Sequence, residues 1–232
     1  MIPHPAQCIS IIGEMSPMPD TAYAKALDNT EYGSVYDNNL NWRADHGPAN
    51  YDRKHTLTLS NVWELPFGRG RRWGSQINRP LDLLLGGWVL NGISTFYSGM
   101  PFTVHVSNTA NVNADFSNVR PDQIGNPNVS SPNANLWFSP AAFTPPQGLY
   151  RDGYVHRNSL RGPREALLNL ALAKTFTVAE GKTLEFRWEN FNALNHPNLG
   201  LPNNVVDVSG AGQITATLVP MRQMQFGLHF RF

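Results

Sequence analysis

The last nine residues of the chain constrain its fold more than any other segment, because large apolar side chains occupy every second position. The segment reads MQFGLHFRF, residues 224–232. Successive side chains of a strand point to opposite faces, so one face is wholly apolar: Met224, Phe226, Leu228, Phe230 and Phe232. The other face carries Gln225, Gly227, His229 and Arg231. Chain ends usually are polar and fray, whereas this one has the pattern of a strand that lies against an apolar surface.

Four further segments show the same pattern with varying regularity: residues 55–65, 87–97, 168–176 and 184–189. The strictest is LEFRWE, in which Leu184, Phe186 and Trp188 alternate with Glu185, Arg187 and Glu189. A period of two marks strands with one apolar and one polar face. The sequence therefore predicts five strands, with a short additional strand at residues 213–218.

Composition favours an all-β chain with long surface loops. Glycine (19) and proline (18) are abundant, and both suppress helix. Lys and Arg (18) balance Asp and Glu (17), so the charge predicts no nucleic-acid partner. The single cysteine, Cys8, allows no intrachain disulfide. No apolar run is long enough for a transmembrane helix, and the first residues lack the pattern of a signal peptide.

The predicted connections alternate between short and long. Residues 177–182 form a tight hairpin turn, with Gly181 at the position that needs a positive φ. Residues 98–163 and 190–220 are long excursions, of the kind that is rare in compact domains and usually functional. The exception is the connection 66–86, which is about twenty residues long and has no explanation in the sequence alone.

An apolar stripe on a strand faces either a second sheet, as in a soluble sandwich, or lipid, as in a membrane barrel. The charged row of LEFRWE suits a water-filled lumen, and the longer segments have about the nine to eleven residues that a tilted strand needs to cross a bilayer. If Phe232 lies at the periplasmic end, the turn 177–182 is periplasmic and both long excursions are extracellular. Short periplasmic turns and long extracellular loops are typical of outer-membrane barrels.

Five stretches together resemble the C-terminal part of a TonB-dependent outer-membrane receptor of the Oar-like type, which carries a carboxypeptidase-regulatory-like domain and is common in Acidobacteria. They are NWRADHGPANYDRKHTLTLSNVWELPFGRGRRW (41–73), LLGGWVLNGISTFYSGMPFTV (84–104), LRGP (160–163), LEFRWENFNALNHPNLGLP (184–202) and RQMQFGLHFRF (222–232). The resemblance covers residues 41–232 and leaves 1–40 as a poorly defined region with part of a strand and an extracellular loop. The closing strand also resembles the outer-membrane C-terminal signal that the barrel-assembly machinery reads.

The resemblance implies a barrel of about 22 antiparallel strands that holds a plug and takes up scarce solutes, driven by the TonB–ExbB–ExbD complex. This chain would supply five or six of those strands, too few to close a barrel. Its partners are then outer-membrane lipid, the barrel-assembly machinery, the rest of the receptor chain and, only through the missing plug, TonB. The chain alone is expected to transport nothing. We expect no enzymatic activity and no cofactor.

The implied site residues fall on the two faces of the last strands. The apolar residues of the assembly signal are Phe232, Phe230, Leu228, Phe226 and Met224, and the lumen-facing residues are Glu185, Arg187, Glu189, His229 and Arg231. Two alternatives stay open: a soluble or secreted β-sandwich that binds carbohydrate through aromatic-rich loops, and a small porin-like protein in which several copies close one barrel.

Motifs with possible chemistry are interpreted as structural. Residues 181–183 (GKT) lack the first glycine of a phosphate-binding loop, and Ser94 lacks the last glycine of a nucleophile elbow. The histidines, His196 among them, have no metal-site spacing, and Asp115 and Asp122 match no calcium loop. Arg69, Arg71 and Arg72 are interpreted as a solvated basic turn. The remaining aromatic residues are expected in interfacial girdles: Trp42, Tyr51, Trp63, Trp73, Trp88 and Trp188.

Overall fold

The main element of the fold is a six-stranded antiparallel sheet in the order β1-β4-β5-β12-β13-β14. The computed structural model describes residues 18–29, 43, 45–107, 119–147 and 152–232. Predictions for Cys8, Trp42 and Asp115 lie outside these residues. The strands of the sheet are β1 (Met18–Tyr23), β4 (His55–Glu64), β5 (Trp88–Tyr97), β12 (Glu165–Ala179), β13 (Lys182–Phe191) and β14 (Gln223–Arg231).

The five strands expected from the alternation are present, within one to three residues of their predicted ends. The longest, β12, extends past the predicted 168–176 on both sides because it pairs with β5 as far as Glu165 and with β13 as far as Ala179. The sixth strand, β1, pairs with β4 from Met18 to Tyr23 and comes from the poorly defined region 1–40.

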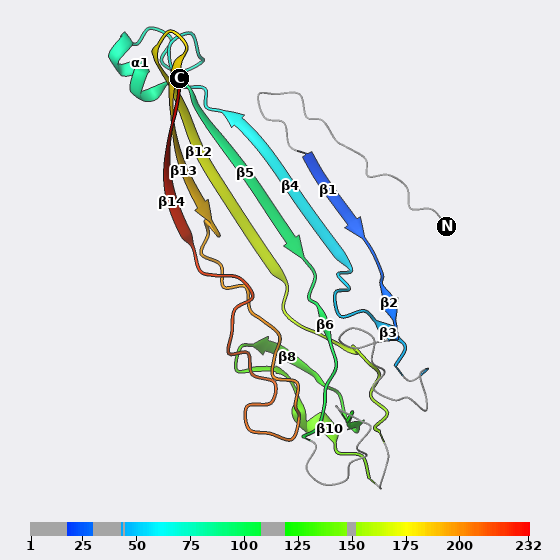
Figure 1. Cartoon of the computed structure of the whole chain (residues 1–232). Helices are drawn as coiled ribbons and strands as arrows, with labels where there is room; N and C mark the ends of the chain where they lie inside the picture. The colour runs from blue at the N-terminus through cyan, green and yellow to red at the C-terminus, as the bar shows by residue number, and fades with distance from the viewer. Residues whose placement is uncertain (1–17, 30–42, 44, 108–118, 148–151) are drawn as a thin grey trace.

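The two ends of the sheet differ in how their strands are connected. The β12–β13 turn, the connection between β4 and β5, and the C-terminus lie at one end (Figure 1). The described parts of the long segments, residues 98–107, 119–147, 152–164 and 192–222, lie at the other end, together with the short strands β2 (Leu27–Asp28) and β3 (Gly47–Pro48). This is the grouping that the parity of the connections predicts.

The 66–86 connection, which the sequence left unexplained, contains the only α-helix among the described residues, α1 (Arg79–Leu85). The side chain of Asn78 caps its first turn by accepting a hydrogen bond from the Leu81 N–H at 3.1 Å, and Pro80 occupies the first turn, where a missing N–H costs nothing. The helix ends at Gly86, whose N–H donates to Asp82 O at 2.8 Å. No helix in the described part of the chain is long and apolar enough to span a membrane.

The long segments are folded rather than structureless and form what we call the cap, residues 45–54, 99–163 and 192–222 without the undescribed positions. Its elements are short: β6 (Pro101–Phe102), β7 (Asp122–Gln123), β8 (Asn128–Asn133), β9 (Leu136–Phe138), η1 (Pro140–Ala142), β10 (Phe143–Thr144) and β11 (Leu160–Arg161). The prediction of a strand at 213–218 is wrong. Within this range only Thr217 forms a β-bridge, an isolated one to Leu199. The backbone of Gln213 and Ile214 is instead used in loop hydrogen bonds: Gln213 O accepts from the Asn203 N–H, and the Ile214 N–H donates to Ala134 O.

The apolar core lies in the cap and not on the sheet. Phe138 is 3% exposed and packs between Phe102 and Phe143, at ring-centroid distances of 5.7 and 6.0 Å. Val104, Ala142 and Val155 complete this cluster. The sheet itself is covered by no second sheet among the described residues, so the arrangement of a β-sandwich is not seen there.

Candidate functional surfaces of the sheet and the cap

The apolar residues of the closing strand share one face with apolar residues of the neighbouring strands. The register places Phe230 opposite Leu184, Leu228 opposite Phe186 and Phe226 opposite Trp188. The rings of Phe226 and Trp188 stack at 6.2 Å with an angle of 8°. Despite these contacts Phe226 stays 71% exposed and Leu228 68%, so the face is continuous, apolar and uncovered.

The same face runs across the whole sheet through pairs related by register. From β12 to β4 it carries Leu170, Leu172 and Phe176, then Leu90 and Phe96, then Leu57, Leu59 and Trp63. Apolar side chains along one face of five neighbouring strands, with no second layer of described residues over them, disfavour a position in water and favour contact with lipid. The structure does not bring Phe232, 93% exposed, into a strand pair.

The charged row predicted to face the lumen lies together on the opposite face of β13 and β14. Glu185 stands opposite His229, and Glu189 opposite Gln225. Arg231 reaches Glu185 at 3.1 Å, and Arg187 reaches Glu189 at 2.7 Å. These pairs are partly solvated, with the Arg231 side chain 75% exposed. All five predicted residues therefore share one polar surface; that it lines a lumen stays a prediction.

One cation interrupts the apolar face. Lys174 lies in register between Trp88 and Phe186 and is 4% exposed. Its Nζ donates to Leu83 O at 2.5 Å and to Gly86 O, and it lies 5.0 Å from the Phe176 ring centroid. The ammonium group thus holds carbonyls at the C-terminal end of α1, where cations are favourable. This contact places α1 against the apolar face.

The cap contains ion pairs that the sequence did not reveal. Arg120 donates to Asp45 at 2.8 Å and to Asp152 at 2.8 Å, with Arg120 and Asp45 each 1% exposed. The Arg120 backbone N–H also donates to Asp152 at 2.6 Å. These bonds join residues from three distant parts of the sequence, so they hold the loops of the cap in one arrangement.

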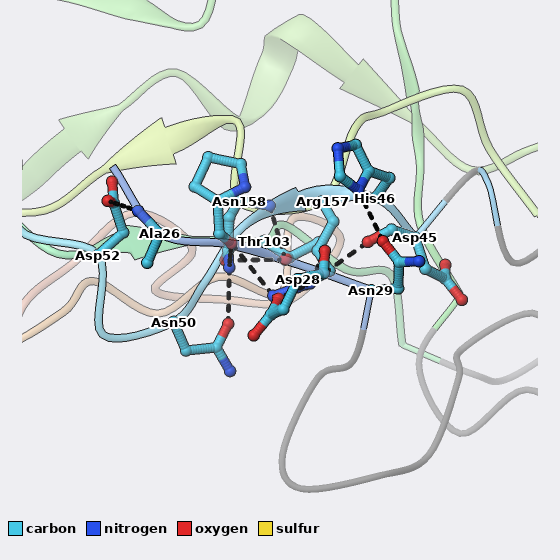
Figure 2. A network of polar contacts seen from close by, with 11 residues as sticks. Ala26, Asp28, Asn29, Asp45, His46, Asn50, Asp52, Thr103, Arg157 and Asn158 are labelled. Carbon is cyan, nitrogen blue, oxygen red and sulfur yellow. Dashed lines mark hydrogen bonds and ion pairs between the residues drawn. The ribbon is translucent and has the colours of Figure 1, made fainter. Parts of the chain in front are cut away.

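A second buried arginine, Arg157, joins the N-terminal segment to the cap (Figure 2). Its guanidinium donates to the Asp28 carboxylate and to Pro48 O at 3.1 Å. Gly47 is required beside it, since a Cβ there would lie 2.7 Å from Arg157 O. The next residue, Asn158, has a left-handed backbone with φ of 54°; its side chain donates to Pro48 O and to Asn50, both at 2.6 Å.

A third pair, Arg161 with Asp52, connects two parts of the cap, strand β11 and the segment before β4. Arg161 donates to the Asp52 carboxylate and to Gly99 O at 3.1 Å, and the Ala26 N–H donates to Asp52 at 2.8 Å. Burial alone raises the pKa of Asp52, but the hydrogen bonds from Arg161 and Ala26 and the charges of Arg161 and Lys54 outweigh burial and leave the pKa below its ordinary value.

Beside these pairs lies a polar cavity of about 330 Å³. Its wall carries several cationic or titratable side chains: Lys25, His46, Lys54, His156, Arg157 and Arg161. Two segments that line the cavity share a short sequence pattern, a Gly-Pro pair that follows charged residues: DHGP (45–48) and RGP (161–163). The pairing itself is invisible in the sequence, since Arg157 and Asp28 are 129 residues apart.

The motifs interpreted as structural lie in structural positions. Gly181, with φ of 72°, is in the β12–β13 turn, and Ser94 is within β5. His196 is exposed in a loop, with Nδ1 3.3 Å from Asn198 Oδ1. Asp122 accepts a hydrogen bond from the Tyr154 N–H at 3.0 Å. Among described residues no three His, Cys, Asp or Glu side chains are placed to hold a metal ion.

Comparison with known proteins gives one match. A family model described as an outer membrane beta barrel domain matches residues 21–225, most of the chain. No curated protein and no solved structure matches it.

Proposed function

We propose a function from the premise that this chain belongs to the outer membrane beta barrel domain family and lies in the bacterial outer membrane. In this proposal the chain forms the C-terminal strands of a TonB-dependent receptor for active solute uptake. In this proposal the rest of the receptor chain supplies the remaining strands, to about 22 in all, and the plug through which TonB acts. The proposal assigns no catalysis to the chain.

The observation that carries the proposal is the open sheet. Among the described residues β1 pairs only with β4, and β14 only with β13. An unpaired strand edge in a bilayer leaves N–H and C=O groups without hydrogen-bond partners, each at a cost of several kcal/mol. Six strands are also fewer than the roughly eight of the smallest single-chain barrels. Further strands must therefore pair with both edges.

The cap supports a receptor rather than a simple anchor. Its loops are joined by buried ion pairs such as Arg120 with Asp45, and they surround the 330 Å³ polar cavity. At the opposite end, the β12–β13 turn occupies only Glu180 and Gly181. A structured extracellular surface above a polar inner wall suits a protein that captures a solute before passing it inward.

The receptor is tested by the size and binding of the protein in its native outer membrane. An antibody against residues 152–163 should detect a species much larger than the 25.8 kDa of this chain, and the periplasmic domain of TonB should capture that species. A 25.8 kDa species that forms stable oligomers and conducts KCl in planar bilayers would contradict the receptor and favour the porin-like alternative, in which several copies close one barrel.

The proposed recognition by the barrel-assembly machinery has its own test, in the full-length protein. Deletion of Phe232, which makes no strand pair, should reduce the folded protein in the outer membrane, measured by heat-modifiable migration. The matched control is Phe232→Tyr, which keeps a terminal aromatic ring and should assemble normally. Normal assembly of the deletion would refute the signal without affecting the receptor proposal.

A further inference from the structure

The helix α1 presents its leucines outward instead of burying them. Leu83 is 57% exposed and Leu84 66%, and Leu81 and Leu85 are also exposed. We propose that the connection 66–86 is an in-plane membrane anchor, whose leucines enter the inner leaflet of the outer membrane while its arginines bind the phosphates of anionic phospholipid. This inference needs the outer-membrane position of the chain and a periplasmic location for the end of the sheet that holds the short turn, and it does not depend on TonB.

The first support is the continuity of α1 with the lipid-facing surface. Lys174 and Trp88 both lie in the apolar face, and both bind the end of α1: Lys174 Nζ donates to Leu83 O, and Trp88 Nε1 donates to Leu84 O at 2.9 Å. Trp88 also contacts Phe186 edge-on at 5.9 Å. The helix therefore lies where the apolar face ends, at the end of the sheet that holds the C-terminus and the short turn (Figure 1).

The second support is the charge of the same connection. It carries four arginines, Arg69, Arg71, Arg72 and Arg79, against a single acid, Asp82. All four arginines are exposed. Arg71 pairs with Glu64 at 2.7 Å, and the Asp82 carboxylate accepts a hydrogen bond from the Arg69 backbone N–H at 2.6 Å. Arginines beside exposed leucines are typical of segments that lie in an anionic interface.

Aromatic residues mark the depth of this anchor. The rings of Phe67 and Trp73 are in contact, with centroids 5.1 Å apart and planes tilted by 47°, and they stay 42% and 51% exposed. Partly exposed aromatic rings near the end of a membrane-spanning strand prefer the boundary between headgroups and acyl chains. A protein partner fits less well, since a seven-residue helix is roughly 10 Å long and offers far less than the roughly 800 Å² per side of a stable interface.

The test measures where α1 lies, in the full-length protein reconstituted in bilayers. Cys8 is replaced by serine, and an NBD fluorophore is attached at Leu84→Cys, a position exposed enough to accept it. The probe is phosphatidylcholine or phosphatidylglycerol with a doxyl quencher at carbon 5. We expect strong quenching at Leu84→Cys, as at the lipid-facing control Phe226→Cys, and none at Tyr154→Cys, 79% exposed in the cap. Heat-modifiable migration verifies that each variant is folded.

The charge half of the proposal is tested with the triple variant Arg69→Gln, Arg72→Gln, Arg79→Gln. At low salt each arginine at an anionic surface favours anionic lipid roughly five-fold, so the preference for quenching by phosphatidylglycerol should fall by about ten-fold or more. The anchor is overturned if doxyl lipid does not quench the label at Leu84→Cys. This holds whether aqueous iodide quenches the label or a second protein covers it. Quenching with no phosphatidylglycerol preference overturns the assignment of the arginines.

Discussion

The sheet and the cap are built from the same chain but for different surroundings. All ten buried apolar residues of the described chain lie outside the six strands, in the cap and the segments that join it. On the sheet, large apolar side chains such as Phe226 and Leu228 are uncovered. Charged pairs differ in the same way: Arg120 with Asp45 is buried, whereas Arg231 with Glu185 is largely solvated.

The difference teaches that the cap carries its own stability, while the sheet depends on lipid and, under the proposed function, on further strands. A cap with a packed aromatic core and buried ion pairs resembles a small water-soluble domain. The sheet has hydrogen bonds between strands but no core on either face. Substitutions should therefore have large local effects in the cap and small ones on the polar face of the sheet.

The largest effect is expected for Arg120→Ala. It leaves the Asp45 and Asp152 carboxylates buried without their partner, and removal of one member of a buried ion pair costs about 3–5 kcal/mol. Hydrogen exchange of the full-length protein in detergent should show loss of protection in residues 119–147 while β12 and β13 stay protected. The matched control is Arg187→Ala, whose side chain is 44% exposed and should cost less than about 1 kcal/mol. Equal losses of stability in the two variants would contradict the contrast between a self-stabilised cap and a solvated polar face of the sheet.

The strands could be predicted from the sequence because their information is local. In LEFRWE the alternation predicts the face on which each side chain lies, and strand β13 contains this segment. The ends of β12 were underpredicted, since Glu165, Ala166 and Leu167 break the alternation and are strand only by pairing with β5. The cap could not be predicted, because Arg157 and Asp28 meet across 129 residues with no periodicity to relate them. The role of Lys174 was hidden for the same reason: its partners are backbone carbonyls of α1.

A smaller effect is expected for Lys174→Ala, which changes the only buried cation of the sheet. The variant removes charge-assisted hydrogen bonds to Leu83 O and Gly86 O. It also removes the cost of burying the ammonium charge and leaves no unpaired charge behind, so the net loss is about 1.5–3 kcal/mol. The predicted result is undocking of α1, seen as faster proteolysis between β4 and β5 while the strands stay intact. Lys182→Ala, exposed at the start of β13, is the control and should leave the proteolysis rate unchanged. An intact connection in Lys174→Ala would show that α1 is held by other contacts.

Acid should weaken the cap before the sheet, in part through Asp52. The pKa of Asp52 in the folded protein lies below its ordinary value of 3.8, so its contribution to stability is present above that value and is lost as the pH falls below it. The loss is smaller than that of Arg120→Ala, because the protonated carboxyl keeps an oxygen that can accept from the Ala26 N–H. The measurement is cap protection against pH for the parent and Asp52→Asn. The variant should show a shallower decline below pH 4, and identical curves would contradict the assignment.

The smallest effect is expected on the polar face, for the pair of Arg231 with Glu185. Its distance of 3.1 Å is close to the 2.8 Å of Arg120 with Asp45, so geometry alone predicts similar strength. The Arg231 side chain is 75% exposed, however, and water and salt screen such a pair to about 0–1 kcal/mol. A double-mutant cycle with Arg231→Gln and Glu185→Gln, measured by denaturant unfolding of the full-length protein, should give a coupling energy in that range that falls further at high salt. A coupling of about 3 kcal/mol would mean that the assembled barrel buries this row, and the contrast between cap and sheet would then hold only for the apolar residues.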